Sequence, residues 1–149
     1  MIKTHQYRIY PTPHQQHVLA IQFGHNRWVW NEALAHIQND LNGKFPGYTS
    51  LASRLPKIKR EEKTSWLQDA NAQTLQATIK RLDLAYQRFF ARTSKGRSPA
   101  YGYPRFKRRT DEQSLEFPQG TSACPDLKCV KLPKLGYVKA KFDRRNIQG

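Results

Sequence analysis

Two stretches of the chain repeat their apolar residues with the period of an α-helix. The first stretch carries Leu19, Phe23, Trp30, Leu34 and Ile37. The second carries Leu75, Ile79, Leu82, Tyr86 and then Phe89 or Phe90. Residues three or four apart share one helical face. The pattern predicts helices from Pro13 to about Asn39 and from just after Asp69 or Asn71 to Ser94. We expect their apolar stripes to pack together, with Asn26 on the first stripe.

Local residues indicate where these helices begin. Thr12 stands at an N-cap position, Pro13 at the first helical position and Gln15 at the third. This is a capping box, with proline where its missing N–H costs nothing. Between the long helices, Thr49 or Ser50 is expected to start a short helix that Pro56 closes. The charged run 57–63 is expected to be solvated.

Alternating apolar and polar residues, typical of strands, occur at both ends of the chain. They are found at residues 3–10, around Glu116, around Lys131 and at residues 138–142. The order strand, helices, strands predicts an α+β fold, in which a small β-lobe is interrupted by an inserted helical bundle. We place the β-lobe at residues 1–10 and 100–149 and the helical lobe at residues 11–99.

The charge balance limits the class of protein and the kind of partner. The 149 residues hold 26 Lys and Arg against 11 Asp and Glu, a net charge of +15, while aromatic residues make up 11%. A disordered basic tail would hold few aromatic residues, and no apolar run is long enough for a transmembrane helix. The start of the chain does not resemble a secretory signal. These features predict a folded, cytoplasmic, nucleoid-associated protein, with a polyanion such as nucleic acid as its partner.

Basic and aromatic residues are mixed in a way that favours phosphate binding. We expect phosphate contacts from Arg105, Lys107, Arg108 and Arg109, which follow Tyr101 and Tyr103. Lys139 and Lys141 share one face of a predicted strand and join this group. The alternative is that these cations only keep the protein in solution.

On the second helix, Gln73, Gln76 and Lys80 project from one face. Glutamine can pair with a base edge in DNA, although a solvated helix face would look the same. Cys124 and Cys129 lack the second ligand pair that a zinc site needs. The carboxylates do not form the cluster that a two-metal nuclease uses. We therefore predict no cofactor, no metal and no catalytic residue.

The order of several motifs resembles the TnpB (OrfB) family encoded by bacterial insertion sequences. The matching stretches are Tyr7–Gln16, Phe23–Asn31, Thr64–Leu67, Leu82–Phe90, Gly102–Lys107 and Leu132–Lys139. Members are RNA-guided DNA nucleases. The resemblance implies a wedge-type β-barrel interrupted by a helical recognition lobe. It also implies a chain that ends before the RuvC-like nuclease domain, so that it is an N-terminal part without activity of its own.

The resemblance further implies partners and roles for single residues. The partners would be a guide RNA, double-stranded DNA beside the target, and a separate or missing RuvC-containing half. Tyr48 and Gln76 match residues that read a short DNA motif, and Arg105, Lys107 and Lys139 suit the guide RNA scaffold. Two alternatives remain: an autonomous helix-turn-helix DNA-binding protein or repressor of transposon origin, and a plain RNA-binding structural protein.

Overall fold

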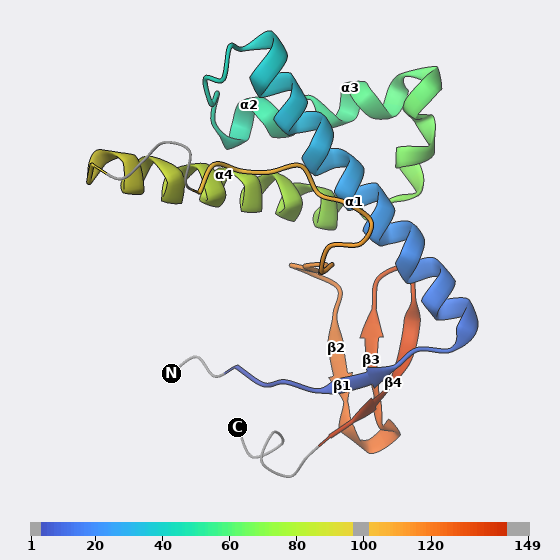
Figure 1. Cartoon of the computed structure of the whole chain (residues 1–149). Helices are drawn as coiled ribbons and strands as arrows, with labels where there is room; N and C mark the ends of the chain where they lie inside the picture. The colour runs from blue at the N-terminus through green and yellow to red at the C-terminus, as the bar shows by residue number, and fades with distance from the viewer. Residues whose placement is uncertain (1–3, 97–101, 143–149) are drawn as a thin grey trace. The chain divides into compact units, whose positions relative to one another are not determined.

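The structure, a computed structural model, describes residues 4–96 and 102–142 of the chain. Its described part contains both helices and an antiparallel sheet, which confirms the α+β class (Figure 1). The chain divides into two compact units. The first, called here the strand unit, comprises Met1–Ile21 and Phe117–Gly149, and the second, the helical unit, comprises Gln22–Glu116.

The strand unit contains a four-stranded sheet in the order β1-β4-β3-β2. Its strands are β1 (Arg8–Tyr10), β2 (Ser122–Cys124), β3 (Cys129–Leu132) and β4 (Gly136–Lys141). All neighbours are antiparallel. The sheet is open, because β1 and β2 are the edges of the order described. Tight hairpins join β2, β3 and β4, whereas β1 comes from the other end of the sequence.

Alternation along β4 separates the two faces of the sheet. Val138 and Ala140 are buried, whereas Lys139 and Lys141 are exposed. Residues paired across an antiparallel ladder share a face, so Ile9, Val130 and Val138 cover one side. The predicted strands around Lys131 and at 138–142 are thus confirmed.

Helix α1 (Pro13–Asp40) begins at the predicted capping box. The Thr12 backbone N–H donates to Gln15 Oε1 at 2.9 Å, and the Gln15 N–H donates to Thr12 Oγ1 at 3.2 Å. Gln15 Nε2 also donates to the Tyr137 carbonyl at 2.8 Å, which ties the start of α1 to the sheet. The capping residue therefore has both a local and a tertiary role.

The helical unit holds the rest of α1 together with four further helical segments. These are α2 (Tyr48–Ala52), α3 (Leu55–Arg60), the 3-10 segment η1 (Glu62–Asp69) and α4 (Ala72–Ser94). Asn71 caps α4, because its side chain accepts from the backbone N–H groups of Gln73 and Thr74. The two predicted stripes meet in one core, whose fully buried residues include Leu34, Ile37, Leu75, Ile79, Leu82 and Tyr86. Leu19 and Phe23, the first members of the α1 stripe, are only half-buried.

A buried polar contact joins the two long helices. Asn26 Oδ1 accepts from the Thr78 hydroxyl at 2.6 Å, and Asn26 Nδ2 donates to the Gln22 carbonyl at 2.9 Å. The same Nδ2 lies 3.3 Å from Thr74 Oγ1. Buried polar groups need such partners, since an unmade hydrogen bond costs about 1–3 kcal/mol. The asparagine on the apolar stripe is therefore part of the core.

Three local predictions were wrong. Pro56 does not close a helix but lies in the first turn of α3, where its missing N–H costs nothing. Residues 115–117 are not a strand, because no strand pairs with them in the described sheet. The strand expected at 3–10 is confined, among described residues, to Arg8–Tyr10, while β2 was not predicted at all.

Candidate nucleic-acid interface

One face of the sheet is basic. Lys139 and Lys141 on β4 stand on it together with Arg8, which pairs directly with Lys141. Lys131 on β3 pairs with Tyr137 and places its ammonium 5.8 Å from that ring. We call these four cations the basic sheet face. Like charges opposite each other destabilise a ladder, so a polyanion that neutralises Arg8 and Lys141 would also stabilise the strand pairing.

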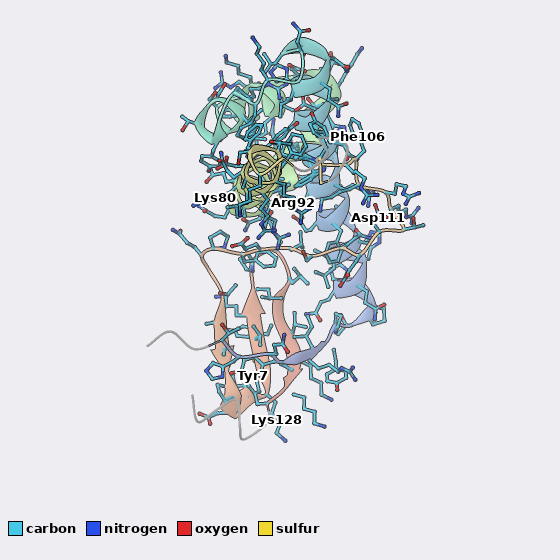
Figure 2. The ribbon with its side chains drawn as sticks, turned by 60° about the vertical axis from the view of Figure 1, so that its left-hand side comes forward. Tyr7, Lys80, Arg92, Phe106, Asp111 and Lys128 are labelled. Carbon is cyan, nitrogen blue, oxygen red and sulfur yellow. The ribbon has the colours of Figure 1, made fainter. Side chains whose placement is uncertain are left out.

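An open groove of about 480 Å³ lies within the strand unit at this face. Its lining residues are Tyr10, Pro125, Lys128, Lys139, Ala140, Lys141 and Phe142. Lys128 closes the β2–β3 hairpin with a φ of 51°, and its carbonyl accepts from the Ala140 N–H at 2.9 Å (Figure 2). This left-handed residue adds a third lysine to the groove. Three lysines beside two aromatic rings suit a phosphodiester strand.

The second basic element is the segment 105–109 of the helical unit, which we call the basic segment. Helix α1 holds its backbone at two points. Trp30 Nε1 donates to the Arg105 carbonyl at 2.8 Å. Asn31 Nδ2 donates to the Lys107 carbonyl at 2.9 Å, and Asn31 Oδ1 accepts from the Lys107 N–H at 2.7 Å. The backbone is thus positioned by α1, while all five side chains of the segment remain exposed.

Lys107 has an unusual electrostatic setting. Its ammonium lies 4.4 Å from the centre of the Trp30 ring, a cation–π contact. Desolvation, and then the nearby Arg81, lower the pKa of Lys107 from its usual value, whereas Asp111 opposes the shift. A phosphate at this position would favour the charged form and would thereby gain from the interaction.

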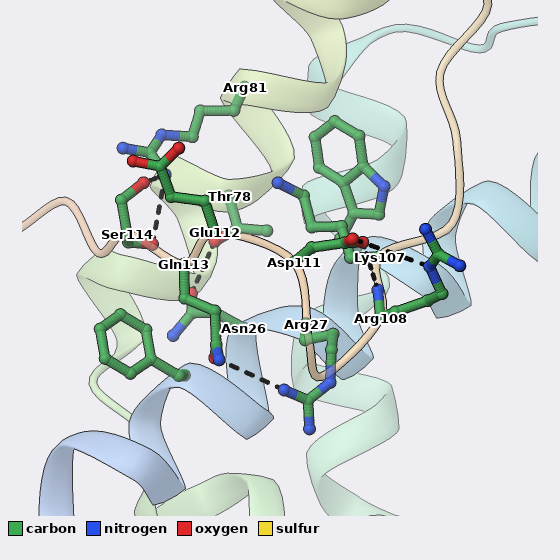
Figure 3. Close-up of a pocket in the computed structure, with 12 residues that line it drawn as sticks. Asn26, Arg27, Thr78, Arg81, Lys107, Arg108, Asp111, Glu112, Gln113 and Ser114 are labelled. Carbon is green, nitrogen blue, oxygen red and sulfur yellow. Dashed lines mark hydrogen bonds and ion pairs between the residues drawn. The ribbon is translucent and has the colours of Figure 1, made fainter.

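A small cavity of about 30 Å³ lies beneath the chain that follows the basic segment (Figure 3). Arg81 on α4 donates to Ser114 Oγ at 2.9 Å, and Arg27 on α1 lies 3.5 Å from Gln113 Oε1. Arg108 Nε lies 3.7 Å from Asp111 Oδ1. These polar contacts keep residues 108–114 against the two long helices. The cavity is too small for a nucleotide and suits one or two water molecules.

The predicted base-reading residues are placed as follows. Lys80 is exposed on α4 (Figure 2). Gln76 is also exposed on this helix, and Gln73 is half-buried at its start. Tyr48 begins α2, where it is half-buried and packs against the helical core. The spacing of three and four residues brings Gln73, Gln76 and Lys80 onto one face of α4.

Most of the predicted phosphate ligands lack an acidic partner. Within residues 4–96 and 102–142 there are four ion pairs, and of the six predicted ligands only Arg108 takes part in one. The side chains of Arg105, Arg109, Lys139 and Lys141 are exposed. These cations are therefore available to an external anion.

The two cysteines face each other across β2 and β3, where Cys124 pairs with Cys129. Both are free thiols, and Cys129 is buried. Burial and the neighbouring Cys124 raise the pKa of Cys129. Among the described residues, no three His, Cys, Asp or Glu side chains gather as a metal site would require. No helix in those parts of the chain has the length and apolar character of a membrane span.

Sequence reasoning missed several residues of these surfaces. Arg8 belongs to the basic sheet face, and Tyr10 to the groove, only because β1 pairs with β4. Asn31 ends one of the family motifs, but its hydrogen bonds to the backbone of Lys107 were not predicted. Side-chain-to-backbone contacts 76 residues apart leave no periodic signal in a sequence.

Exposed cations on an antiparallel sheet and on an anchored segment are typical of a nucleic-acid-binding protein. Residues 1–43 match the family model HTH_OrfB_IS605, described as a helix-turn-helix domain. The chain is 29% identical over 146 residues to "Putative RNA-guided DNA endonuclease InsQ" of Escherichia coli (strain K12), covering 97% of this chain and 35% of that protein. It is 31% identical over 115 residues to "Putative RNA-guided DNA endonuclease" of Streptomyces pristinaespiralis, covering 75% of this chain and 27% of that protein.

These matches confirm the resemblance to the TnpB (OrfB) family seen in the sequence. It spans about a third or less of the length of these two curated relatives. The residues matched by the family model form β1 and the single uninterrupted helix α1, as far as they are described.

Proposed function

We propose that this chain is the nucleic-acid-binding part of a TnpB-like RNA-guided DNA endonuclease. In this proposal it binds the guide RNA scaffold and a short DNA motif beside the target, and it does not cut DNA by itself. A RuvC-containing half, on the same or another chain, would supply cleavage. We also propose that the strand unit belongs to a wedge-type β-barrel.

One observation carries the proposal: the predicted phosphate ligands are exposed and largely without acidic partners. Such cations release counterions when they meet phosphates, which favours binding. In the strand unit we assign Lys139 and Lys141 to the RNA scaffold. In the helical unit we assign Arg105, Lys107, Arg108 and Arg109 to the same ligand. The names of the two relatives agree with an RNA partner.

For the DNA motif we assign Gln73, Gln76 and Lys80 on α4, together with Tyr48 on α2. The exposed carboxamide of Gln76 can offer both a donor and an acceptor to one base. Lys80, one turn further along the helix, can bind the adjoining phosphate. This assignment gives the exposed face of α4 a function besides solvation.

The alternative of an autonomous helix-turn-helix repressor is less favoured by α1. A helix-turn-helix reader needs two helices joined by a short turn, the second of which enters the major groove. Residues 13–40 instead form one helix. A repressor would bind a discrete duplex tightly without RNA and as a dimer.

The phosphate assignment is tested by replacing Arg105, Lys107, Arg108 and Arg109 together with alanine. Binding to RNA and duplex should weaken roughly equally across sequences. The slope of log affinity against log salt should flatten by about one unit per lost contact. The control replaces the four cations Lys57, Lys59, Arg60 and Lys63, which changes the net charge equally. Equal slope changes in both variants would contradict a local phosphate site.

The motif assignment is tested by Gln76→Ala, with Gln87→Ala on the same helix as the control. Folding should be preserved, because alanine is the better helix former. With guide RNA and the remaining part of the nuclease supplied, Gln76→Ala should lose about 1–3 kcal/mol of discrimination at one base pair of a randomised duplex library. An unchanged base preference at every position would mean that Gln76 is a solvated surface residue without a role in reading DNA. The isolated chain should also leave DNA uncut in the presence of Mg²⁺.

A further inference from the structure

Helix α1 carries a second stripe at the edge of the core, where its residues are half-buried and Trp28 packs partly against the core. Gly24, Trp28, Asn31 and Ala35 recur at spacings of 4, 3 and 4 residues, so they share one helical face. None of the four belongs to the buried set of the helical unit. Gly24 and Ala35, at the two ends of the stripe, have small side chains and leave space on either side of the Trp28 ring.

Two aromatic residues from distant segments stand beside this stripe. Trp66 of η1 is 38% exposed and meets Trp28 edge to face, with ring centres 5.2 Å apart. His25 packs on Trp66 at 5.1 Å. Phe106 of the basic segment is 48% exposed. The stripe, Trp66 and Phe106 line an open cleft of about 550 Å³ together with Arg27 and Glu32. We call it the aromatic cleft.

The hydrogen bonds of α1 explain why Phe106 is exposed beside this cleft. Trp30 and Asn31 hold the backbone of Arg105 and Lys107, the two neighbours of Phe106. The ring is thereby presented beside the cleft, not buried in the core. An exposed phenylalanine leaves apolar area in water, and a ligand that covers the ring would remove that area from water.

The charges around the cleft favour an anionic occupant. Arg27 lines it and Arg105 precedes Phe106 in the sequence, whereas the ammonium of Lys107, on the other side of Phe106, lies over the Trp30 ring. Glu32, the acid in the lining, is already neutralised by Arg54, whose Nη1 lies 3.0 Å from Glu32 Oε2. The Asn31 amide is occupied by the Lys107 backbone. The cleft therefore offers ring faces and positive charge, with little free hydrogen-bonding capacity for reading a base edge.

We propose that the aromatic cleft binds an unpaired nucleobase of a single-stranded nucleic acid, by stacking and without base preference. Rings beside cations are the combination that single-strand binding proteins use, since every base has a π-face and every nucleotide a phosphate. A base within a duplex is already stacked and cannot enter. The proposal rests on the proposed function as a nucleic-acid-binding protein and adds a site for unpaired strand, which can be RNA or DNA.

The test compares three 12-nucleotide probes by fluorescence anisotropy: an oligouridine, an oligothymidine and an abasic phosphodiester strand of the same charge. The wild-type chain should bind the strands with bases about tenfold more tightly than the abasic strand. Phe106→Ala and Trp66→Ala should each remove most of that difference and leave abasic binding unchanged. Phe90→Ala is the control, because Phe90 is 42% exposed but lies outside the cleft.

Trp66→Ala can disturb the folding of η1. Phe106→Ala then still tests the proposal, because Phe106 lies outside the helices and strands. A larger loss of affinity for oligouridine than for oligothymidine in these variants assigns the site to RNA. A larger loss for oligothymidine assigns it to DNA. Equal binding of all three probes by the wild-type chain would overturn the cleft assignment while leaving the proposed function intact. Failure to bind any probe or duplex would instead refute the proposed function. A dimer that Phe106→Ala dissociates would show that a second copy covers the cleft, which also overturns the inference.

Discussion

Asn31→Ala should weaken nucleic-acid binding although it removes no charge. The variant deletes both hydrogen bonds to Lys107, of 2.7 and 2.9 Å, and leaves the Trp30 bond as the one described hydrogen bond from α1 to the basic segment. Each such bond contributes about 0.5–1.5 kcal/mol net. Because this site is exposed, we take about 1–2 kcal/mol for the pair. The basic segment would then have to be ordered during binding, and that cost would appear as weaker affinity.

A cost of this size corresponds to about 5- to 30-fold lower affinity for RNA or duplex. The number of cations is unchanged, so the salt dependence should keep its slope. Anisotropy titrations at several salt concentrations measure both quantities. Asn39→Ala, near the end of the same helix, is the control. Limited trypsin digestion gives a second measure, since cleavage after Arg105 to Arg109 should become faster.

Two results would refute this reasoning. An affinity loss below twofold would mean that anchoring the basic segment does not matter for binding. A flatter salt dependence would mean that Asn31→Ala displaces cations from the ligand, so that its effect is not one of ordering.

Further predictions concern stability and thiol reactivity. Burial lowers the pKa of His25 below 6.5, so the unfolded state binds more protons than the folded state below that pH. The free energy of unfolding should therefore fall as the pH drops below 6.5. Urea titrations should show this pH dependence in the wild-type chain and its loss in His25→Phe. Asn26→Ala should cost about 1–3 kcal/mol in the same assay, because the Thr78 hydroxyl loses its buried partner. Since the pKa of Cys129 is raised, iodoacetamide should modify it slowly at neutral pH in Cys124→Ser and rapidly in urea, and fast labelling of the folded chain would contradict the burial.

The features predicted correctly from the sequence are those that depend on neighbouring residues. Thr12 and Gln15 are three positions apart, so their capping box can be read directly and is confirmed. The α4 stripe is confirmed for the same reason, since helical periodicity is a local property. Asn71 at the start of α4 is one of the two start points expected and fulfils the capping role.

The wrong predictions depended on partners that a local pattern does not contain. Leu115 and Phe117 alternate as in a strand, but no described strand is available to pair with them. β2 consists of Ser-Ala-Cys, which has little strand propensity, and exists because β3 supplies its hydrogen bonds. Proline is ambiguous, since it both ends helices and opens them, and Pro56 does the latter.

The candidate surfaces were predictable to different degrees. The basic segment could be recognised from composition, because four of its five residues are cationic. The aromatic cleft could not, because Trp28, Trp66 and Phe106 lie about 40 residues apart and are united by hydrogen bonds and packing that sequence spacing does not encode.

The pairing of β1 with β4 has a consequence for how the protein is made. Arg8 pairs with Lys141, so the first strand must wait until residue 141 has left the ribosome before it finds its partner. The helical unit is contiguous from Gln22 to Glu116 and can fold earlier. At about 5–20 residues per second, the 25 residues from Glu116 to Lys141 take about 1–5 s to synthesise. During that interval the nascent chain would present a finished helical unit and an unpaired strand, which is the stage at which a chaperone or an early RNA contact would find it.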